Sequence, residues 1–144
     1  MKKIILIALG MLVLCGTSFA QTKKIIKREQ LPSAALQFIQ HNWNNVSISR
    51  ATMETEGYKV EYDVRLAGGT EIEFNRDGGW KEIESSKEIP ESAIPVGIRT
   101  YVRQHHRGHK VVKMEKKSYG YEVTLDNDRE YTFDTDGNLK QAED

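Results

Sequence analysis

Tyr58-Lys59-Val60-Glu61-Tyr62-Asp63-Val64-Arg65-Leu66 alternates apolar and charged side chains without a break. Successive side chains of a β-strand point to opposite faces, so this alternation predicts a strand with one buried and one solvated face. Ile72 and Phe74 continue the pattern between Glu71, Glu73 and Asn75. The turns at Glu56-Gly57, Gly68-Gly69 and Gly78-Gly79 supply the positive φ that tight antiparallel hairpins need. These residues therefore predict antiparallel strands with a solvated, charged face.

A helix is predicted before these strands, over about residues 32–43. Pro32 suits the first turn of a helix, and the apolar residues after it recur every three or four positions, as in a helix that buries one side. Strand patterning begins at Val46 and Ile48, and a fourth strand is predicted from Trp80 to Glu84. The first half of the chain is thus one helix followed by four short strands.

The second half of the chain repeats this order. Ile89-Pro90 matches Leu31-Pro32, Gly120-Tyr121 matches Gly57-Tyr58, and Asp136-Gly137 matches Asp77-Gly78, at offsets of 58, 63 and 59 positions. Helical spacing from Ser92 to Val102 predicts the second helix, whose start Pro95 and Gly97 weaken or delay. Strands are expected at about 109–117, 120–125, 129–134 and 138–142. The hairpin at 125–130 reads as shorter than its counterpart around Gly68-Gly69.

The two halves predict an α+β fold. Each repeat, at about 24–85 and 86–144, is a helix-plus-four-strand unit whose helix covers the apolar side of its strands. The connection Ser85-Ser86-Lys87-Glu88 is too short to separate two domains, so residues 21–144 are expected to form one domain. We expect a continuous or nearly continuous antiparallel sheet of about eight strands.

The N-terminus predicts export. Lys2-Lys3, the apolar run from Ile4 to Leu14 and the small-x-small site Ser18-Phe19-Ala20 have the pattern of a signal peptide over residues 1–20. Cys15 reads as part of the removed peptide, because Leu14 is not the small residue that precedes a lipidated cysteine. We expect a periplasmic or secreted protein with no stable membrane insertion after cleavage.

The composition after cleavage excludes several classes of protein. Cleavage takes Lys2 and Lys3 from the 21 basic residues, leaving 19 against 21 acidic ones, and removes the single cysteine. A mildly acidic chain does not suit nucleic acid, and a chain without cysteine has no disulfide, thiol nucleophile or thiolate metal site. No serine lies in a Gly-x-Ser-x-Gly context, and the glycine pairs lie in hairpins and not in a phosphate loop. We expect no enzyme and no cofactor, with a hydrolase as the least supported alternative.

Several motifs together resemble a known family: the exported N-terminus, the repeated helix-plus-four-strand order, the Leu31-Pro32 and Ile89-Pro90 helix starts, the Gly-Tyr-x-Val strands and the Phe-x-x-Asp-Gly hairpins. Over residues 24–142 the chain resembles the PepSY-like family of β-lactamase-inhibitor-like periplasmic proteins. The resemblance implies a tandem fold similar to that of the β-lactamase inhibitor protein, with a sheet that receives a protein or peptide. It implies no catalytic residue.

Histidines and aspartates raise the question of metal binding. His105, His106 and His109 have helical ligand spacing, but Gly108 is expected to end the helix and move His109 into a loop. Asp126-Asn127-Asp128 and Asp134-Thr135-Asp136-Gly137-Asn138 resemble calcium loops, yet hairpin turns use the same residues for backbone reasons. The turn interpretation is favoured, and no metal site is assigned.

The aromatic residues on strands are predicted to be core. This set is Tyr58, Tyr62, Phe74, Tyr121, Tyr131 and Phe133, with Trp80 added. Trp43, near the end of the first helix, reads either as a packed cap or as an exposed interface anchor, with packing favoured.

The sequence thus predicts an exported, non-enzymatic binding domain for an envelope or secreted protein or peptide. The binding residues expected on the exposed sheet face are Lys59, Glu61, Asp63, Arg65, Glu71 and Glu73. The alternative is a periplasmic small-ligand or metal sensor or carrier that uses His105, His106 and His109. The sequence leaves the oligomeric state open.

Overall fold

The computed structural model describes residues 20–143. The predicted signal peptide, Cys15 included, lies outside these residues except for Ala20. The helical elements are η1 (Arg28–Gln30), α1 (Ser33–Asn42), η2 (Glu91–Ala93) and α2 (Val96–His105). The strands are β1 (Thr22–Ile25), β2 (Ile48–Glu56), β3 (Lys59–Leu66), β4 (Glu71–Asn75), β5 (Trp80–Glu84), β6 (Val111–Lys117), β7 (Gly120–Leu125), β8 (Glu130–Phe133) and β9 (Leu139–Glu143).

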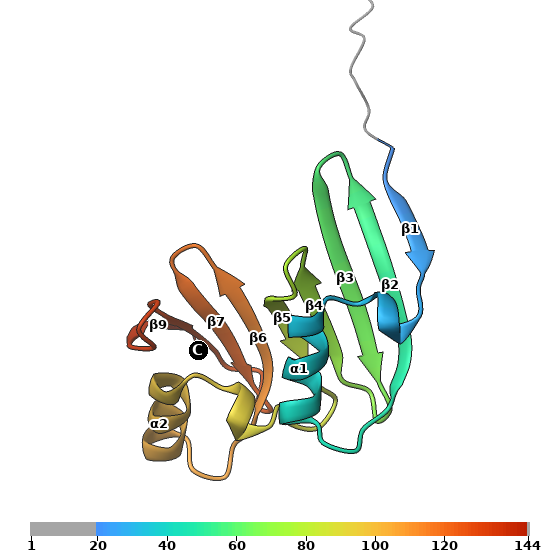
Figure 1. The fold of residues 1–144 in the computed structure, drawn as a ribbon. Coiled ribbons are helices and arrows are strands. Elements are labelled where there is room, and N and C mark those ends of the chain that lie inside the picture. Colours follow the sequence, from blue (N-terminus) through green and yellow to red (C-terminus); the bar gives the residue numbers. More distant parts are fainter. Residues whose placement is uncertain (1–19, 144) are drawn as a thin grey trace, which may run out of the picture.

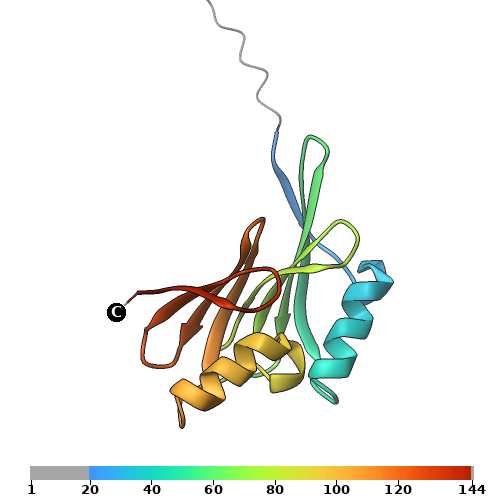
Figure 2. The same cartoon turned by 90° about the vertical axis from the view of Figure 1, so that its left-hand side faces the viewer.

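The strands form one antiparallel sheet, and both helices pack on one face of it (Figure 1). Each strand neighbours the strands next to it in sequence, so the sheet runs from β1 to β9 in chain order. Seen from the side, α1 and α2 lie together on that face (Figure 2). This is the α+β architecture with an antiparallel sheet that the alternation predicted.

The described sheet has nine strands, where about eight were expected, because β1 adds an edge strand. Thr22–Ile25 pairs with Thr52–Thr55 of β2. All four residues of β1 are exposed, so they carry no alternation of buried and solvated positions that a pattern could reveal.

The two halves correspond element by element, but with a register different from the predicted one. Arg28–Gln30 and Glu91–Ala93 lie 63 positions apart, as do Ser33–Asn42 and Val96–His105. From β4 and β5 to β8 and β9 the offset is 59. The offset changes from 63 to 59 in the hairpin β2–β3, which is four residues longer than β6–β7. The hairpin at 125–130 was predicted to be shorter than its counterpart at 66–71, but the two are equal in length.

The start of the second helix was predicted too early. Pro32 occupies the N-cap of α1, and Pro95, not Pro90, occupies the N-cap of α2. Pro90 instead precedes the short η2. A proline disfavours helical backbone in the residue before it, so Pro95 separates η2 from α2 and the helix begins at Val96.

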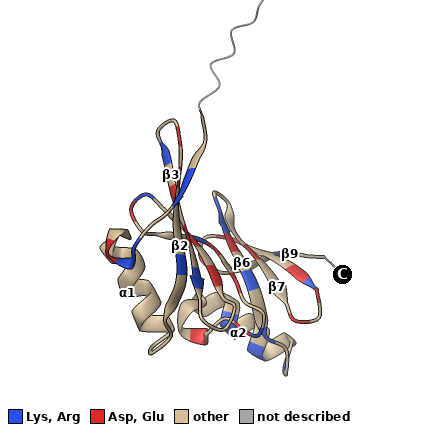
Figure 3. Ribbon diagram, turned by 90° about the vertical axis from the view of Figure 1, so that its right-hand side faces the viewer, with Lys and Arg blue, Asp and Glu red and all other residues tan. Residues whose placement is uncertain are grey.

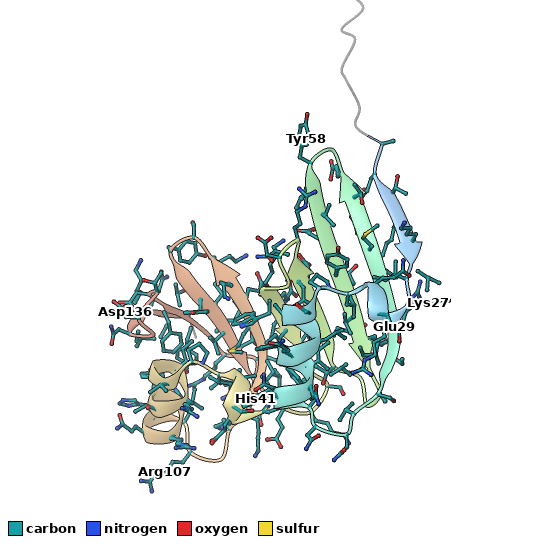
Figure 4. All side chains as sticks on the ribbon, in the orientation of Figure 1. Lys27, Glu29, His41, Tyr58, Arg107 and Asp136 are labelled. Carbon is teal, nitrogen blue, oxygen red and sulfur yellow. The ribbon has the colours of Figure 1, made fainter. Side chains whose placement is uncertain are left out.

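Tyr58 is not a core residue. It lies at the tip of the β2–β3 hairpin with 93% of its surface exposed and projects beyond the sheet (Figure 4). Tyr121 pairs with Lys116 in the same way that Tyr62 pairs with Met53, so Tyr62 and not Tyr58 is the counterpart of Tyr121. The shared Gly-Tyr motif misled the prediction because the two hairpins differ in length.

The core lies between the helices and the sheet. Ala35 and Ile39 of α1 and Ile98 and Val102 of α2 are buried in one apolar cluster with alternate residues of the strands. The strand residues with no more than 2% of their surface exposed are Val64, Leu66, Ile72, Phe74, Ile83, Met114, Val123, Leu125 and Phe133. Trp43 is 8% exposed and contacts Phe38 edge to face, so it is packed rather than free as an anchor.

Candidate binding surface

The six predicted binding residues lie on the face of the sheet that no helix covers. Their strand neighbours Val64, Leu66, Ile72 and Phe74 are buried, which directs Lys59, Glu61, Asp63, Arg65, Glu71 and Glu73 to the opposite side. We call this side the sheet face. Basic and acidic positions are interspersed along β2, β3, β6 and β7 (Figure 3). The predicted placement on the solvated side is what the structure shows.

Acidic residues line up across the sheet face. Asp63, Glu73, Glu82, Glu115 and Glu122 follow one another in cross-strand register from β3 to β7. Like charges directly opposite each other destabilise a sheet. Lysines from neighbouring positions offset this repulsion.

Three lysines bridge the acidic row. Lys81 bonds to Glu61 and, at 2.7 Å, to Glu73. Lys113 lies 3.1 Å from both Glu82 and Glu115, and Lys117 lies 2.6 Å from Glu115. Burial alone would raise the pKa of the Glu61 carboxyl, but hydrogen bonds from Lys81 and Lys59 outweigh it and lower that pKa. Hydrogen bonds to Glu82 and Glu115 raise the pKa of Lys113. These groups are therefore charged at neutral pH.

A hollow of about 380 Å³ opens on the sheet face around β3 to β5. The ion pair between Arg65 and Glu71, 3.2 Å long, lies in it, with side chains that remain 59% and 57% exposed. Arg50 and Glu84 line the same hollow and are exposed, and neither forms an ion pair within residues 20–143. Because Arg50 pairs with Arg65 and Glu71 pairs with Glu84 in the strand register, the hollow has a basic and an acidic side.

Four of the six predicted residues are brought together here: Asp63, Arg65, Glu71 and Glu73 line the hollow, and Lys59 and Glu61 lie nearer the hairpin tip. The prediction missed Lys23, Arg50, Glu82 and Glu84, which also line it. The alternation in Trp80–Glu84 carried the signal for the two glutamates. Lys23, 2.8 Å from Asp63, could not be found because β1 was not predicted.

The three histidines have separate surroundings. His105 is exposed and its ring lies 4.6 Å from that of Tyr101. His106 packs between Tyr101 and Tyr131, and its buried Nε2 has no hydrogen-bond partner among residues 20–143. His109 lies in the loop after α2, as predicted, with Nδ1 2.8 Å from Asp126. Within the described residues, no three histidine, cysteine or acidic side chains are close enough to hold a metal ion.

The aspartate-rich turn at 134–138 closes a hairpin. Oδ1 of Asp134 accepts hydrogen bonds from the backbone N–H groups of Asp136 and Asn138, at 3.0 and 2.8 Å. Asn75 makes the same two bonds to Asp77 and Gly79 in the equivalent turn of the first half, each 3.0 Å long. An uncharged amide performs the same task, so backbone geometry accounts for these residues.

Comparisons with known proteins agree with this architecture. A family model described as "Putative beta-lactamase-inhibitor-like, PepSY-like" matches residues 60–141. A "putative calcium-regulated periplasmic protein" from Bacteroides thetaiotaomicron is 32% identical, with a TM-score of 0.80 over 85% of this chain and 97% of that chain. A "putative periplasmic protein of unknown function" from Bacteroides vulgatus is 34% identical, with a TM-score of 0.77 over 87% of this chain and 100% of that chain.

A second Bacteroides vulgatus protein, from the DUF2874 family, is 31% identical, with a TM-score of 0.77 over 85% of this chain and 97% of that chain. No curated protein matches the chain. Among the helices of residues 20–143, none has the length and apolar character needed to cross a membrane. The match over residues 60–141 and the likeness to three periplasmic proteins give one result: the chain belongs to the PepSY-like, β-lactamase-inhibitor-like family.

Proposed function

We propose that this protein is an exported, non-enzymatic binding domain that holds an envelope or secreted protein or peptide on its sheet face. We further infer that its two halves are copies of one helix-plus-four-strand unit, with β1 as an addition. The observation that carries the proposal is the open sheet face with its hollow and its ordered rows of charge.

Stability does not account for this arrangement of charge. An exposed ion pair contributes only about 0–1 kcal/mol, and acidic residues directly opposite each other oppose sheet formation. A fixed pattern of basic and acidic side chains on a rigid sheet does, however, give specificity toward a partner with the complementary pattern. The unpaired Arg50 and Glu84 supply charges that a partner can pair without first breaking an ion pair.

The partner proposed for the hollow carries charges of both signs. Arg50 and Arg65 attract carboxylates on one side, and Glu71 and Glu84 attract ammonium or guanidinium groups on the other. Strands β2 and β5 are three strand spacings apart, or about 14 Å. An extended peptide spans this distance with about four residues, since each adds about 3.3 Å.

An exchange of charges tests the proposal. Arg65→Glu combined with Glu71→Arg keeps an ion pair in place but reverses its direction in the hollow. The matched control is Lys27→Glu with Glu29→Lys, which exchanges two exposed charges at η1 that lie outside the hollow. Residues 21–144 and both variants are immobilised, and proteins retained from the envelope extract of the source organism are identified by mass spectrometry.

A protein retained by the native chain and by the Lys27/Glu29 variant, but lost from the Arg65/Glu71 variant, supports the proposal. Equal retention by all three chains would contradict it. Because the similar Bacteroides thetaiotaomicron protein is described as calcium-regulated, the capture is run in calcium and in EDTA, which tests whether that property extends to this chain.

A further inference from the structure

Two equivalent grooves lie at the C-terminal ends of the two helices. The α1 groove, about 830 Å³, is lined by Leu36, Gln40, Trp43, Asn44 and Ile48 among others. The α2 groove, about 290 Å³, is lined by the residues 63 positions later: Arg99, Arg103, His106, Arg107 and Val111. The fold therefore places a groove at the corresponding position of each half, although the two differ in volume.

The two grooves differ in their charged residues. Leu36, Gln40 and Asn44 of the α1 groove correspond to three arginines in the α2 groove, Arg99, Arg103 and Arg107. The α2 groove also contains Lys110, so it has four basic residues against Glu88 and Glu91. The α1 groove is lined by Arg28 and Arg50 and by no acidic residue, so each groove has two more basic than acidic side chains. What the second half alone contains is the row of three arginines spaced four positions apart.

Two of the four cations are already engaged. Arg103 donates to both carboxylate oxygens of Glu91, with Nε 3.1 Å from Oε1, and Lys110 lies 2.8 Å from Glu88. Arg99 and Arg107 form no ion pair within residues 20–143. Arg99 is half-buried, and Arg107 extends beyond the end of α2 (Figure 4).

The floor of the α2 groove is apolar. Ile89, Ile94, Val102 and Val111 line it and are 3–7% exposed. Its volume lies near the lower limit of ligand pockets, about 300 Å³, so it has room for one or two side chains and none for a folded element. Guanidinium groups pair with carboxylates through two parallel hydrogen bonds. An apolar floor under two unpaired arginines suits a segment that carries both an apolar and a carboxylate side chain.

We propose that the α2 groove binds a short peptide segment in which acidic residues alternate with apolar ones. An apolar side chain lies against Ile94 and Val102, and a carboxylate pairs with Arg99 and Arg107. This site lies on the helix side of the sheet and is independent of the proposed function of the sheet face.

The test uses residues 21–144 and a fluorescein-labelled peptide of alternating leucine and glutamate, followed by fluorescence anisotropy. The same peptide with glutamine in place of glutamate is the ligand control. Arg99→Gln with Arg107→Asn removes both unpaired cations and gives position 107 the residue type of its counterpart Asn44. Arg76→Gln, which removes an exposed arginine of the β4–β5 turn outside the hollow and both grooves, is the matched protein control.

We expect the glutamate peptide to bind the native chain and the Arg76 variant equally. Loss of charge-assisted hydrogen bonds should weaken its binding to the Arg99/Arg107 variant by about tenfold or more. Unchanged urea unfolding of that variant would establish that the fold is intact, since neither arginine makes an ion pair to lose.

Three outcomes would overturn the proposal: no binding of the glutamate peptide, equal binding of the glutamine peptide, or equal affinity of the Arg99/Arg107 variant. Vesicles containing phosphatidylglycerol are tested in parallel. Binding of vesicles that depends on both arginines, without binding of the peptide, would replace the peptide with an anionic membrane surface. The Arg65/Glu71 variant should bind the peptide as the native chain does, so a failure at the sheet face and a failure at the α2 groove are distinguishable.

Discussion

Gly97 in the first turn of α2 is expected to be intolerant of alanine, although alanine is the better helix former. A Cβ atom at position 97 would lie 2.4 Å from the carbonyl oxygen of Gly137 and 2.9 Å from its carbonyl carbon. Carbon atoms in favourable contact are about 3.5–4.0 Å apart, so the β8–β9 turn would have to move by about 1 Å. That turn is fixed, because the N–H of Gly137 donates to the carbonyl of Asp134 and Gly137 has a φ of +83°.

Two effects of opposite sign decide the magnitude. Replacing glycine by alanine in a helix gains up to about 1 kcal/mol. Forcing an extra methyl group into a packed contact costs about 1–3 kcal/mol. A contact of 2.4 Å with a backbone carbonyl oxygen belongs at the upper end of that cost. With the gain of about 1 kcal/mol subtracted, we expect Gly97→Ala to lower the free energy of unfolding by about 2 kcal/mol.

The assay is equilibrium unfolding in urea, followed by the fluorescence of the buried Trp43 and the half-buried Trp80. The control is Ala34→Gly, since Ala34 is the counterpart of Gly97 in α1 and lies near Gly78 of the equivalent turn. It should lose only the helix propensity, up to about 1 kcal/mol. If propensity alone mattered, the two variants would change stability in opposite directions. A Gly97→Ala protein as stable as the native chain, or more stable, would refute the packing argument.

Three further substitutions exchange one half's chemistry for the other's, or remove a titrating group. Backbone hydrogen bonds, chiefly from Asn138, lower the pKa of Asp134, so the stability that they contribute is lost as the pH falls below 3.8. Asp134→Asn, which introduces the residue type of Asn75, should therefore lose less stability in acid than the native chain does. An unchanged acid dependence of urea unfolding would contradict this. Burial, followed by the charges of Arg129, His105 and His109, lowers the pKa of His106, so folding opposes its protonation and the free energy of unfolding falls as the pH drops below 6.5. His106→Phe should flatten that part of the curve of stability against pH. An equally steep fall in the variant would be inconsistent with a buried neutral imidazole. Lys116 lies over Trp80, with Nζ 4.3 Å from the ring centroid, and burial lowers the pKa of Lys116, so the native chain should gain stability as the pH rises toward 10.5. Lys116→Met, with the residue type of its counterpart Met53, should abolish that gain and should keep the free energy of unfolding at neutral pH within about 1 kcal/mol of the native value. A larger loss would assign Lys116 a structural role.

Strict alternation made the sheet face predictable. Every second residue from Lys59 to Arg65 is charged, as are Glu71 and Glu73 on either side of Ile72, and the structure places these side chains on the uncovered side. The loop position of His109 could also be anticipated, because Gly108 adopts a φ of +83° after the helix. In both cases one local rule was enough, because no contact with a distant segment altered the result.

The errors arose where length or distant contacts decide the structure. Tyr58 and Tyr121 share a motif, but the longer β2–β3 hairpin carries Tyr58 out to the tip, and only the strand register reveals this. The exposed strand β1 forms because β2 offers it an edge, and Thr22–Ile25 contains no pattern of its own. The two grooves escaped prediction because each joins a helix to segments before and after it, which become neighbours only in the folded chain.

The two halves keep the residues that shape the backbone and differ in those that meet solvent. Asn75 and Asp134 close equivalent turns, and Gly78 and Gly137 lie against the first turns of equivalent helices. Leu36, Gln40 and Asn44, in and just after α1, instead correspond to arginines in and just after α2. We therefore expect differences between the halves to alter the chemistry of the grooves more than the folding of the chain.

The two proposed sites lie on opposite sides of the sheet, and this has an energetic consequence. A partner held in the hollow lies over β2 to β5 on the uncovered side of the sheet, so it leaves the α2 groove open. Substitutions at sites that share no contacts have additive effects, within about 0.3–0.5 kcal/mol. The Arg65/Glu71 exchange and the Arg99/Arg107 substitution should therefore act independently when combined in one chain. The combined variant should lose the retained envelope protein only as much as the Arg65/Glu71 variant does, and the acidic peptide only as much as the Arg99/Arg107 variant does. A larger loss of either ligand would mean that this ligand contacts both sites.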